Sequence, residues 1–354
     1  MVARTDIPFM MHTIPHLVKS CNFDFHRKVL VVDTAPLTGD KVNRPGIGTM
    51  EQLRENCDEL ILRGVMDETI DMDYSKSYQR RIYKKHFGTD RLGPTHNYKG
   101  YPILGSIFAI EEVPGDYVLH FDSDMLLYQK PGYSWIQEAI DLLERREDVM
   151  FVRPLSGPPT KDGSLVQRVP YQRDPEDFYR FKFFGSRAFL IQREKFEQLL
   201  PLPTIWMGYK NQWMKQLPSP LLNEVNTFLH RGALDSWEVM VSQKLENTTH
   251  VRATLANPQA WTLHPIDRGP DFMNNLTAII RKIEEGEVPS EQAGNYDLML
   301  DVWLPWLALS QGKETEFVTV ESVTAEAIKT DVVETEVAKT EKKDAEGERL
   351  TFNR

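Results

Sequence analysis

Cysteine is almost absent from this sequence: the 354 residues contain only two, Cys21 and Cys57. Two cysteines cannot form a disulfide framework of the kind that stabilises small secreted domains, nor a zinc cluster. No apolar run reaches the roughly 18 residues that a membrane-spanning helix needs. The short apolar patch at Ile7–Met11 is soon interrupted by His12, which is unlike a secretory signal. We therefore expect a reducing, cytoplasmic setting and no transmembrane segment.

Positive charge is also in short supply. The chain has 42 Lys and Arg against 52 Asp and Glu, which gives a formal net charge of −10. This balance argues against a general affinity for nucleic acid or for an anionic membrane. An anionic ligand would have to be held locally, by a metal ion or by a few placed Arg and Lys side chains. The hydrophobic fraction of 41% is that of an ordinary soluble globular protein.

Strand patterns alternate with helix patterns over most of the chain, which predicts an α/β fold. We expect a mixed, mainly parallel sheet flanked by helices. The expected strands are Pro8–Ile14, Lys28–Thr34, Leu60–Val65, Tyr117–Asp124 and Val149–Leu155. The expected helices are Pro15–Ser20, Met50–Leu60, Tyr98–Val113, Ser134–Asp148 and Ser236–Leu245.

The end of the chain has a different composition. Residues 311–354 are mostly Thr, Val, Glu and Lys, and no aromatic residue occurs between Phe317 and Phe352. Such a segment cannot bury enough apolar area to offset the entropy of ordering its chain. We expect an acidic, disordered tail there, so that the folded domain covers residues 1–310.

Two carboxylates, Asp122 and Asp124, stand two residues apart within the apolar stretch Tyr117–Tyr128. They repel each other, and burying them unpaired is costly. Side chains two apart on a strand point to the same face, so both can address one ion. Open α/β sheets place ligands at the carboxyl ends of their strands, and hard oxygen ligands suit Mg²⁺ or Mn²⁺. A metal site is the prediction; an acidic turn that closes the strand is the alternative.

A second Asp-x-Asp triplet, Asp71 to Asp73, provides a control. A chain this rich in Asp is expected to contain such triplets by chance, so the motif alone is weak evidence. Nothing around Asp71 and Asp73 indicates a site. We expect a solvated acidic loop there.

The stretch "VLHFDSDMLL" resembles the metal-binding DxD motif of GT-A-fold glycosyltransferases, which use nucleotide-sugar donors. Only the DxD is specific, although other parts of the chain follow in the same order. The resemblance implies a GT-A (Rossmann-like) domain with a nucleotide-binding half at about 1–125 and an acceptor half at about 126–310. It implies that Asp122 and Asp124 hold the metal ion and that Asp122 and Ser123 also contact the donor.

The same resemblance assigns donor contacts in the first half of the chain. His12 and Thr13, in "HTIPHL", and Asp33, at the end of "VLVVDT", stand where the family holds the base and ribose. Lys99 precedes the DxD strand and could touch phosphate or ribose. A helix cap at Asp33 and a simple helix start at Lys99 are the alternatives.

The segment "ALDSWEVMVSQKL" resembles the family's late helix, whose first turn carries the general base. Spacing places this role on Glu238, with Asp235 in reserve, because Trp237 stands where the family more often has an acid. Acidic residues are favoured at any helix N-terminus by the helix dipole, which is the alternative for both.

Two further segments complete the resemblance. "WTLHPIDRG" is similar to the C-terminal stretch whose His completes the metal shell, so His264 would join Asp124 and favour Mn²⁺, and Arg268 would meet the diphosphate. "FKFFGSRAFLI" is similar to the strand beside the donor sugar, at Gly185 and Ser186. A structural His and an ordinary strand bulge are the alternatives.

Together these residues imply a divalent-metal-dependent glycosyltransferase of the hexosyltransferase type. It would transfer a sugar from a nucleoside-diphosphate sugar, UDP being the commoner nucleotide in the family, to a hydroxyl of a sugar, glycan or small molecule. A carboxylate base favours inversion at the anomeric carbon. The aromatic residues Trp206, Tyr209 and Trp213 could stack on an acceptor or belong to the core.

Two other functions stay open. A haloacid-dehalogenase-like phosphatase would use the first Asp of the DxD as its nucleophile. That class normally has Thr or Val where this chain has Leu126, and carries the motif near the start of its domain. A catalytically inactive, transferase-like scaffold is the non-enzymatic alternative.

Overall fold

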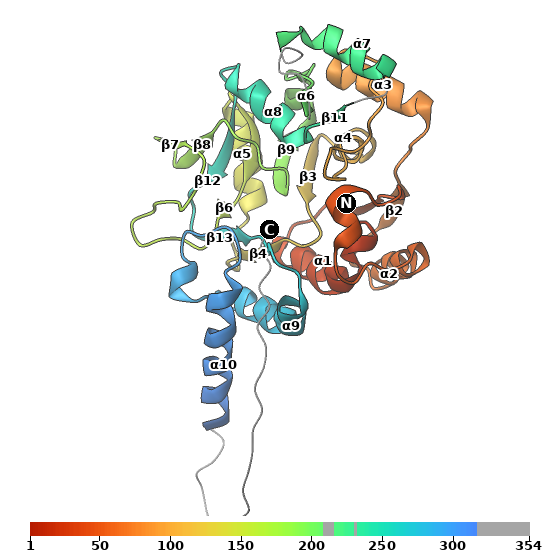
Figure 1. The fold of residues 1–354 in the computed structure, drawn as a ribbon. Coiled ribbons are helices and arrows are strands. Elements are labelled where there is room, and N and C mark those ends of the chain that lie inside the picture. Colours follow the sequence, from red (N-terminus) through yellow and green to blue (C-terminus); the bar gives the residue numbers. More distant parts are fainter. Residues whose placement is uncertain (208–215, 230–231, 317–354) are drawn as a thin grey trace, which may run out of the picture. The chain divides into compact units, whose positions relative to one another are not determined.

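The main sheet has six strands in the order β3-β9-β5-β12-β8-β7. The computed structural model describes residues 1–207, 216–229 and 232–316 (Figure 1). The strands of this sheet are β3 (Tyr117–Phe121), β5 (Val149–Arg153), β7 (Tyr171–Asp174), β8 (Phe178–Phe181), β9 (Ala188–Gln192) and β12 (Val251–Leu255). Helices and sheets are mixed throughout, so the prediction of an α/β fold is confirmed.

The direction of the strands differs from the expectation. Within the main sheet, β5 and β12 pair in parallel, whereas the other described pairings are antiparallel. The expectation of a mainly parallel sheet is therefore wrong for this sheet. One of these antiparallel pairings has a local cause: β7 and β8 follow each other with a short connection and no helix between them. Strands joined by a short connection pair antiparallel, because a parallel pair needs a long crossover.

Three smaller sheets surround the main one. β1 (Val29–Val32) pairs in parallel with β2 (Glu68–Asp71). A three-stranded sheet has the order β4-β13-β6, and β10 pairs with β11. These strands are β4 (Leu126–Gln129), β6 (Leu155–Ser156), β10 (Trp206–Met207), β11 (Ala233–Leu234) and β13 (Ala260–Leu263).

Serine residues begin several of the helices. The hydroxyls of Ser75, Ser134 and Ser236 each accept a backbone N–H from the first turn of α3, α5 and α8, respectively. The helices are α1 (Ile7–Cys21), α2 (Met50–Leu62), α3 (Lys76–Phe87), α4 (Leu104–Glu112), α5 (Trp135–Arg145), α6 (Arg193–Glu197), α7 (Ser219–Leu229), α8 (Trp237–Glu246), α9 (Pro270–Glu284) and α10 (Leu300–Glu316). None of the described helices is both long and apolar enough to cross a bilayer.

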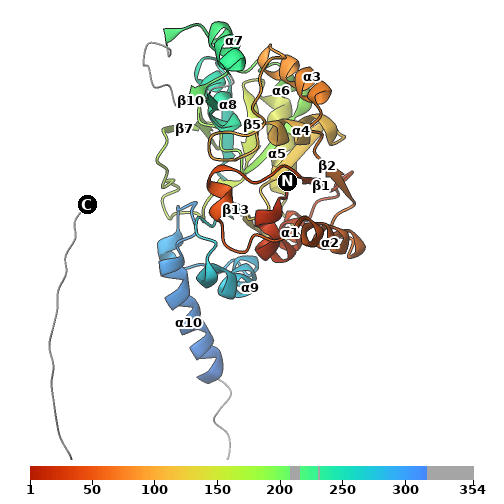
Figure 2. The same cartoon turned by 45° about the vertical axis from the view of Figure 1, so that its right-hand side comes forward.

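The strand expected at Pro8–Ile14 is wrong, because these residues lie in α1. Phe9, Met10 and Thr13 are buried at helical spacing, and Pro8 is tolerated because it lies in the first turn. In Figure 2, α1 and α2 lie together beside the β1–β2 sheet, and α1 also packs on α9 and β4. The strand expected at Leu60–Val65 is wrong too: these residues form the end of α2 and the following turn.

The expected boundary near residue 310 coincides with a change in the structure. Contacts divide the chain into a compact unit, Met1–Gln311, and the remainder, Gly312–Arg354. Helix α10 runs to Glu316 and so overlaps the beginning of the predicted tail. Residues 317–354 of that tail lie outside the described residues.

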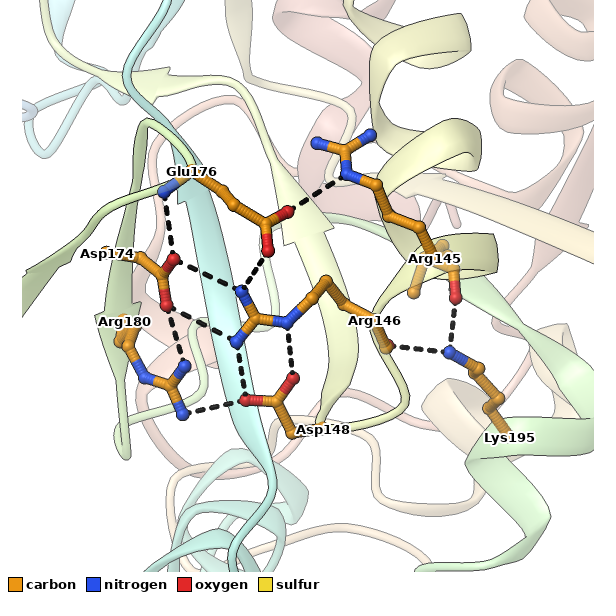
Figure 3. A network of polar contacts seen from close by, with 8 residues as sticks. Arg145, Arg146, Asp148, Asp174, Glu176, Arg180 and Lys195 are labelled. Atoms are coloured by element: carbon orange, nitrogen blue, oxygen red, sulfur yellow. Dashed lines mark hydrogen bonds and ion pairs between the residues drawn. The ribbon is translucent and has the colours of Figure 1, made fainter.

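A ring of paired charges ties β7 and β8 to the segment after α5 (Figure 3). Arg146 and Arg180 both donate to Asp174, and both also pair with Asp148. The Asp174 side chain is 6% exposed. Burial raises the pKa of this carboxyl, but the Glu176 N–H and the two arginines outweigh it and lower the pKa to about 2.

Candidate active site

A cavity of about 630 Å³ opens beside the carboxyl end of β3. Its lining comes from segments that are far apart in the sequence. Nine of the predicted site residues line it: Lys99, Asp122, Ser123, Asp124, Ser186, Asp235, Glu238, His264 and Arg268. The fold thus brings the DxD, the start of α8 and the loop after β13 to one place.

The turn between β3 and β4 is held from both sides. The Asp122 N–H donates to the Arg187 carbonyl just before β9, at 2.7 Å. The Thr13 hydroxyl of α1 donates a second hydrogen bond to this turn, at the Ser123 carbonyl, and Thr13 itself is fully buried. Thr13 therefore supports the turn and does not line the cavity, although it was predicted to contact the nucleotide.

Asp124 is the more buried carboxylate of the pair, with a side chain that is 8% exposed. Its Oδ2 accepts a hydrogen bond from Nη2 of Arg268. Its Oδ1 is buried and finds no hydrogen-bond partner among the described residues. A buried carboxylate oxygen without a partner is costly, and marks a place where a ligand can bind.

His264 is connected to the same arginine. Its Nε2 lies 3.3 Å from Arg268 Nη2, and its Nδ1 lies 3.3 Å from Asp297 Oδ1. The hydrogen bond from His264 outweighs burial and lowers the pKa of Asp297 below its ordinary value. With Nδ1 donating to Asp297, the Nε2 lone pair is directed toward Arg268, which is the tautomer a metal-binding imidazole needs.

Asp122 is more open, with a side chain that is 40% exposed, and its Oδ1 lies 3.1 Å from His120 Nε2. Burial acts to raise its pKa, but the hydrogen bond with His120 and nearby positive charge lower the pKa below its usual value. The carboxyl is therefore ionised at neutral pH and available to a cation.

As they are arranged in this structure, the candidate ligands Asp122, Asp124 and His264 fit a divalent ion only in part. In the part of the chain that the structure describes, no group of three or more His, Cys, Asp or Glu side chains converges as a metal site. The unpartnered Oδ1 of Asp124 and the oriented Nε2 of His264 are nevertheless suitable ligands, with Asp122 close by in the same turn. Oxygen ligands with one imidazole suit Mn²⁺. The residues fit such an ion once Arg268 has moved from between Asp124 and His264.

The start of α8 places two acids in the cavity. Glu238 lies in the first turn, and its Oε2 accepts hydrogen bonds from the backbone N–H of Ser186 at 2.9 Å and its hydroxyl at 3.1 Å. Asp235 precedes the helix, and its Oδ1 accepts the N–H of Ser236 at 2.7 Å. Glu238 is thus oriented by Ser186 in the turn before β9, whereas Asp235 is engaged in its own turn.

Gly185 does not line the cavity, but it makes room for a side chain that supports the site. A Cβ at this position would lie 3.3 Å from Nη1 of Arg153, which is buried. The Arg153 guanidinium in turn lies 4.4 Å from the centre of the Tyr296 ring, and Tyr296 stacks on His264. Gly185 therefore leaves room for an arginine that packs against the support of His264.

Asp33 and His12 also lie outside the cavity. His12 is exposed on α1. Asp33 is buried and accepts a hydrogen bond from the Tyr74 hydroxyl at 2.6 Å, while Lys41 Nζ lies 3.7 Å from it. Burial raises the pKa of Asp33, but His96, Lys41 and Tyr74 together lower it to about 2. The carboxylate of Asp33 is connected to the cavity through Lys41, which lines it.

The sequence analysis missed a cationic and aromatic rim. It consists of Lys41, Arg44, Tyr98, Tyr101 and Arg187. Arg44 donates to the Tyr101 hydroxyl at 3.0 Å.

Two glycines, Gly39 and Gly100, allow two of the chain segments that carry this rim to approach each other closely. A Cβ on Gly100 would lie 1.9 Å from the Thr38 carbonyl oxygen, and one on Gly39 would lie 2.3 Å from the Lys99 carbonyl carbon. Both glycines have positive φ, at 83° and 58°. The available signal for this rim in the sequence was a glycine in each of two basic segments. No local pattern, however, indicates that the two segments lie next to each other.

The remaining predictions concern residues away from the cavity. Asp71 is exposed and pairs with Arg54 at 2.8 Å, and Asp73 accepts the Ser75 N–H at 2.7 Å. Neither lines the cavity, as expected of the control triplet. Trp206 is buried in the core. Tyr209 and Trp213 lie outside the described residues.

Comparisons with known proteins add little. No protein-family model matches the chain, and no curated protein matches it significantly. Among solved structures, GalNAc-T7 with UDP, GalNAc and Mn²⁺ is similar at a TM-score of 0.36 and 13% identity. The match covers 67% of this chain and 36% of that one. Such a likeness carries no argument about function, which therefore depends on the geometry of the cavity.

Proposed function

We propose that the protein is a divalent-metal-dependent glycosyltransferase that transfers a sugar from a nucleoside-diphosphate sugar to an acceptor hydroxyl. The observation that carries this proposal is the content of the cavity. Asp122 and Asp124 at a strand end, His264, Arg268 and the helix-start carboxylate of Glu238 all line it. These groups are what a reaction with a charged leaving group and a hydroxyl nucleophile requires.

The leaving diphosphate is the more demanding partner, because negative charge develops on it as the glycosidic bond breaks. Asp124 and His264, with Asp122, would hold the metal ion, which supplies Lewis-acid stabilisation of that charge when bound. Arg268 and Arg187 both line the cavity and would contact the phosphate oxygens. The rim residues Lys41 and Arg44, together with Lys99, add positive charge in the cavity, which a chain of net charge −10 otherwise lacks.

The acceptor hydroxyl needs a base. We assign this role to Glu238, since Ser186 fixes Oε2 and leaves Oε1 for the acceptor. Glu238 would take the proton as the acceptor oxygen attacks the anomeric carbon, and the diphosphate would leave from the opposite side. Inversion follows from this arrangement. A positioned base of this kind contributes about 10²–10⁴ in rate.

The test is a titration of the purified protein with UDP-sugars and GDP-sugars, with and without Mn²⁺, followed by thermal shift and calorimetry. We expect donor-selective stabilisation that requires Mn²⁺ and is lost in Asp124→Asn, with UDP-sugars as the preferred donors. The matched control is Asp73→Asn, which changes the other Asp-x-Asp triplet and should behave as wild type. Equal donor affinity with and without Mn²⁺ would contradict the metal assignment.

The same preparation separates the alternatives. A phosphatase would hydrolyse p-nitrophenyl phosphate and form a phosphoenzyme that Asp122→Asn abolishes. A scaffold would bind the donor without transferring or hydrolysing it. Transfer of sugar to an acceptor hydroxyl, lost in Glu238→Gln, is the result that supports the proposal.

A further inference from the structure

Arg268 occupies the place that an ion shared by Asp124 and His264 would need. Its Nη2 donates to Asp124 Oδ2 and lies 3.3 Å from His264 Nε2. An ion bound to both side chains would sit about 2.0–2.2 Å from each donor atom. The ion and the Arg268 guanidinium would share His264 Nε2, whose single lone pair cannot serve both, and they would lie on the same carboxylate of Asp124, where their positive charges repel each other. Occupancy by the ion and occupancy by Arg268 therefore exclude each other.

The polar contacts that hold Arg268 in this place, among the described residues, are those to Asp124 and His264. It belongs to the loop between β13 and α9, and its side chain is 18% exposed. The Nε–H is buried and has no hydrogen-bond partner in the described part of the chain. The guanidinium thus has a donor that Asp124 and His264 leave unused, and an unmade buried hydrogen bond costs about 1–3 kcal/mol.

A diphosphate is the kind of ligand that can draw Arg268 away. Its oxygens offer paired acceptors to the fork of a guanidinium, including the Nε–H that is unused here. Asp124 cannot do the same, because its Oδ1 has no hydrogen bond to Arg268 or to any other described residue. Moving Arg268 onto a diphosphate would satisfy the arginine and release Asp124 and His264 together.

We propose that Arg268 is an internal cation that competes with the divalent ion for Asp124 and His264. A diphosphate ligand removes the competitor, so metal and nucleotide bind with positive coupling. By thermodynamic linkage each raises the affinity of the other by the same factor, which for couplings of this kind is about 5–150-fold. The proposal rests on the proposed function for the identity of the anionic ligand, but the competition itself concerns this chain and the metal alone.

The experiment measures Mn²⁺ binding by electron paramagnetic resonance, with Mn²⁺ alone and with Mn²⁺ at saturating UDP. In the wild type we expect UDP to tighten Mn²⁺ binding by at least about 5-fold. In Arg268→Gln we expect Mn²⁺ alone to bind at least about 5-fold more tightly than in the wild type, and the effect of UDP to shrink toward none. Arg268→Met, neutral and similar in length, repeats the test if the Gln variant is unstable.

Arg54→Gln is the matched control, because Arg54 pairs with Asp71 of the other Asp-x-Asp triplet, away from the cavity. It should leave both Mn²⁺ affinities unchanged. Mn²⁺ that binds Arg268→Gln no more tightly than the wild type would overturn the competition. Failure of the proposed function looks different: neither protein would respond to UDP, while the comparison with Mn²⁺ alone would still stand.

Discussion

Asp174 and Asp124 are both buried aspartates next to arginine, yet their surroundings differ. Asp174 accepts from Arg146, Arg180 and the Glu176 N–H, so both of its oxygens have partners (Figure 3). Asp124 has one oxygen on Arg268, and the other has no partner in the described residues. Both oxygens of Asp174 already have hydrogen-bond partners, so this carboxylate has no unused acceptor for a ligand. Asp124 retains an unused acceptor inside a cavity, which is how a binding site differs from a structural ion network.

The difference has an energetic consequence. A saturated buried network resists change, because removing one member leaves the others charged and unpaired. An unsaturated carboxylate costs stability in the free protein, by about 1–3 kcal/mol, and recovers it when a ligand binds. Stability should therefore depend on Asp174, whereas binding and turnover should depend on Asp124.

Asp124→Asn is the change with the largest expected effect. We expect sugar transfer in the presence of Mn²⁺ to fall by about 10³-fold or more, since stabilisation of the charge on the leaving group is lost. The folded state should be no less stable, because the change removes a charge that is only half paired. Initial rates and thermal unfolding measure the two effects. An active Asp124→Asn, or one as destabilised as an Asp174 variant, would break the comparison.

Glu238→Gln comes next. The amide cannot accept the proton, so the rate of transfer at saturating substrate should fall by about 10²-fold or more, while donor affinity is retained. Single-turnover rates together with a donor titration test this. Asp235→Asn is the matched variant, because Asp235 also lines the cavity. If Asp235→Asn loses transfer and Glu238→Gln does not, the base is Asp235.

Asp174→Asn should act on stability alone. The two partly exposed arginines would each lose a charged partner that is itself buried, and we expect a loss on the order of 3 kcal/mol in the free energy of unfolding. Urea unfolding measures this loss. Transfer at 25 °C should match the wild type, because Asp174 does not line the cavity. A change in Mn²⁺ or donor affinity would show that the two regions are coupled.

The smallest expected effect is the acid dependence of this network. Burial acts to raise the pKa of Asp174, but the Glu176 N–H and the two arginines lower it to about 2 in the folded protein, below the ordinary value of 3.8. A lowered folded pKa contributes stability that is present above the unfolded pKa and is lost as pH falls through the folded one. About 2 kcal/mol should therefore be lost between pH 4 and pH 2. In Asp174→Asn this loss in the free energy of unfolding should be absent when unfolding is measured between pH 4 and pH 2.

Local patterns predicted several elements well. An apolar run followed by Asp122 predicted β3 and its turn, and helical patterns that begin at Ser134 and Ser236 predicted α5 and α8. They failed at Pro8–Ile14, where a short apolar run fits a strand or a helix equally and neighbouring helices decide. Local patterns did not indicate β7 and β8 either, because whether a Pro- and Gly-rich segment forms antiparallel strands depends on the sheet it joins.

Local patterns in the chain specify which residue types stand at the end of β3 and the start of α8, since strand patterns and spacing are local properties. The tertiary structure decided which of them meet. It placed Thr13 under the turn, brought Lys41 and Arg44 to the rim, and set Arg268 between Asp124 and His264. Those contacts join residues far apart in the chain, and their partners depend on how the sheets and helices pack. For the same reason, only the folded structure shows that one oxygen of Asp124 has no partner among the described residues.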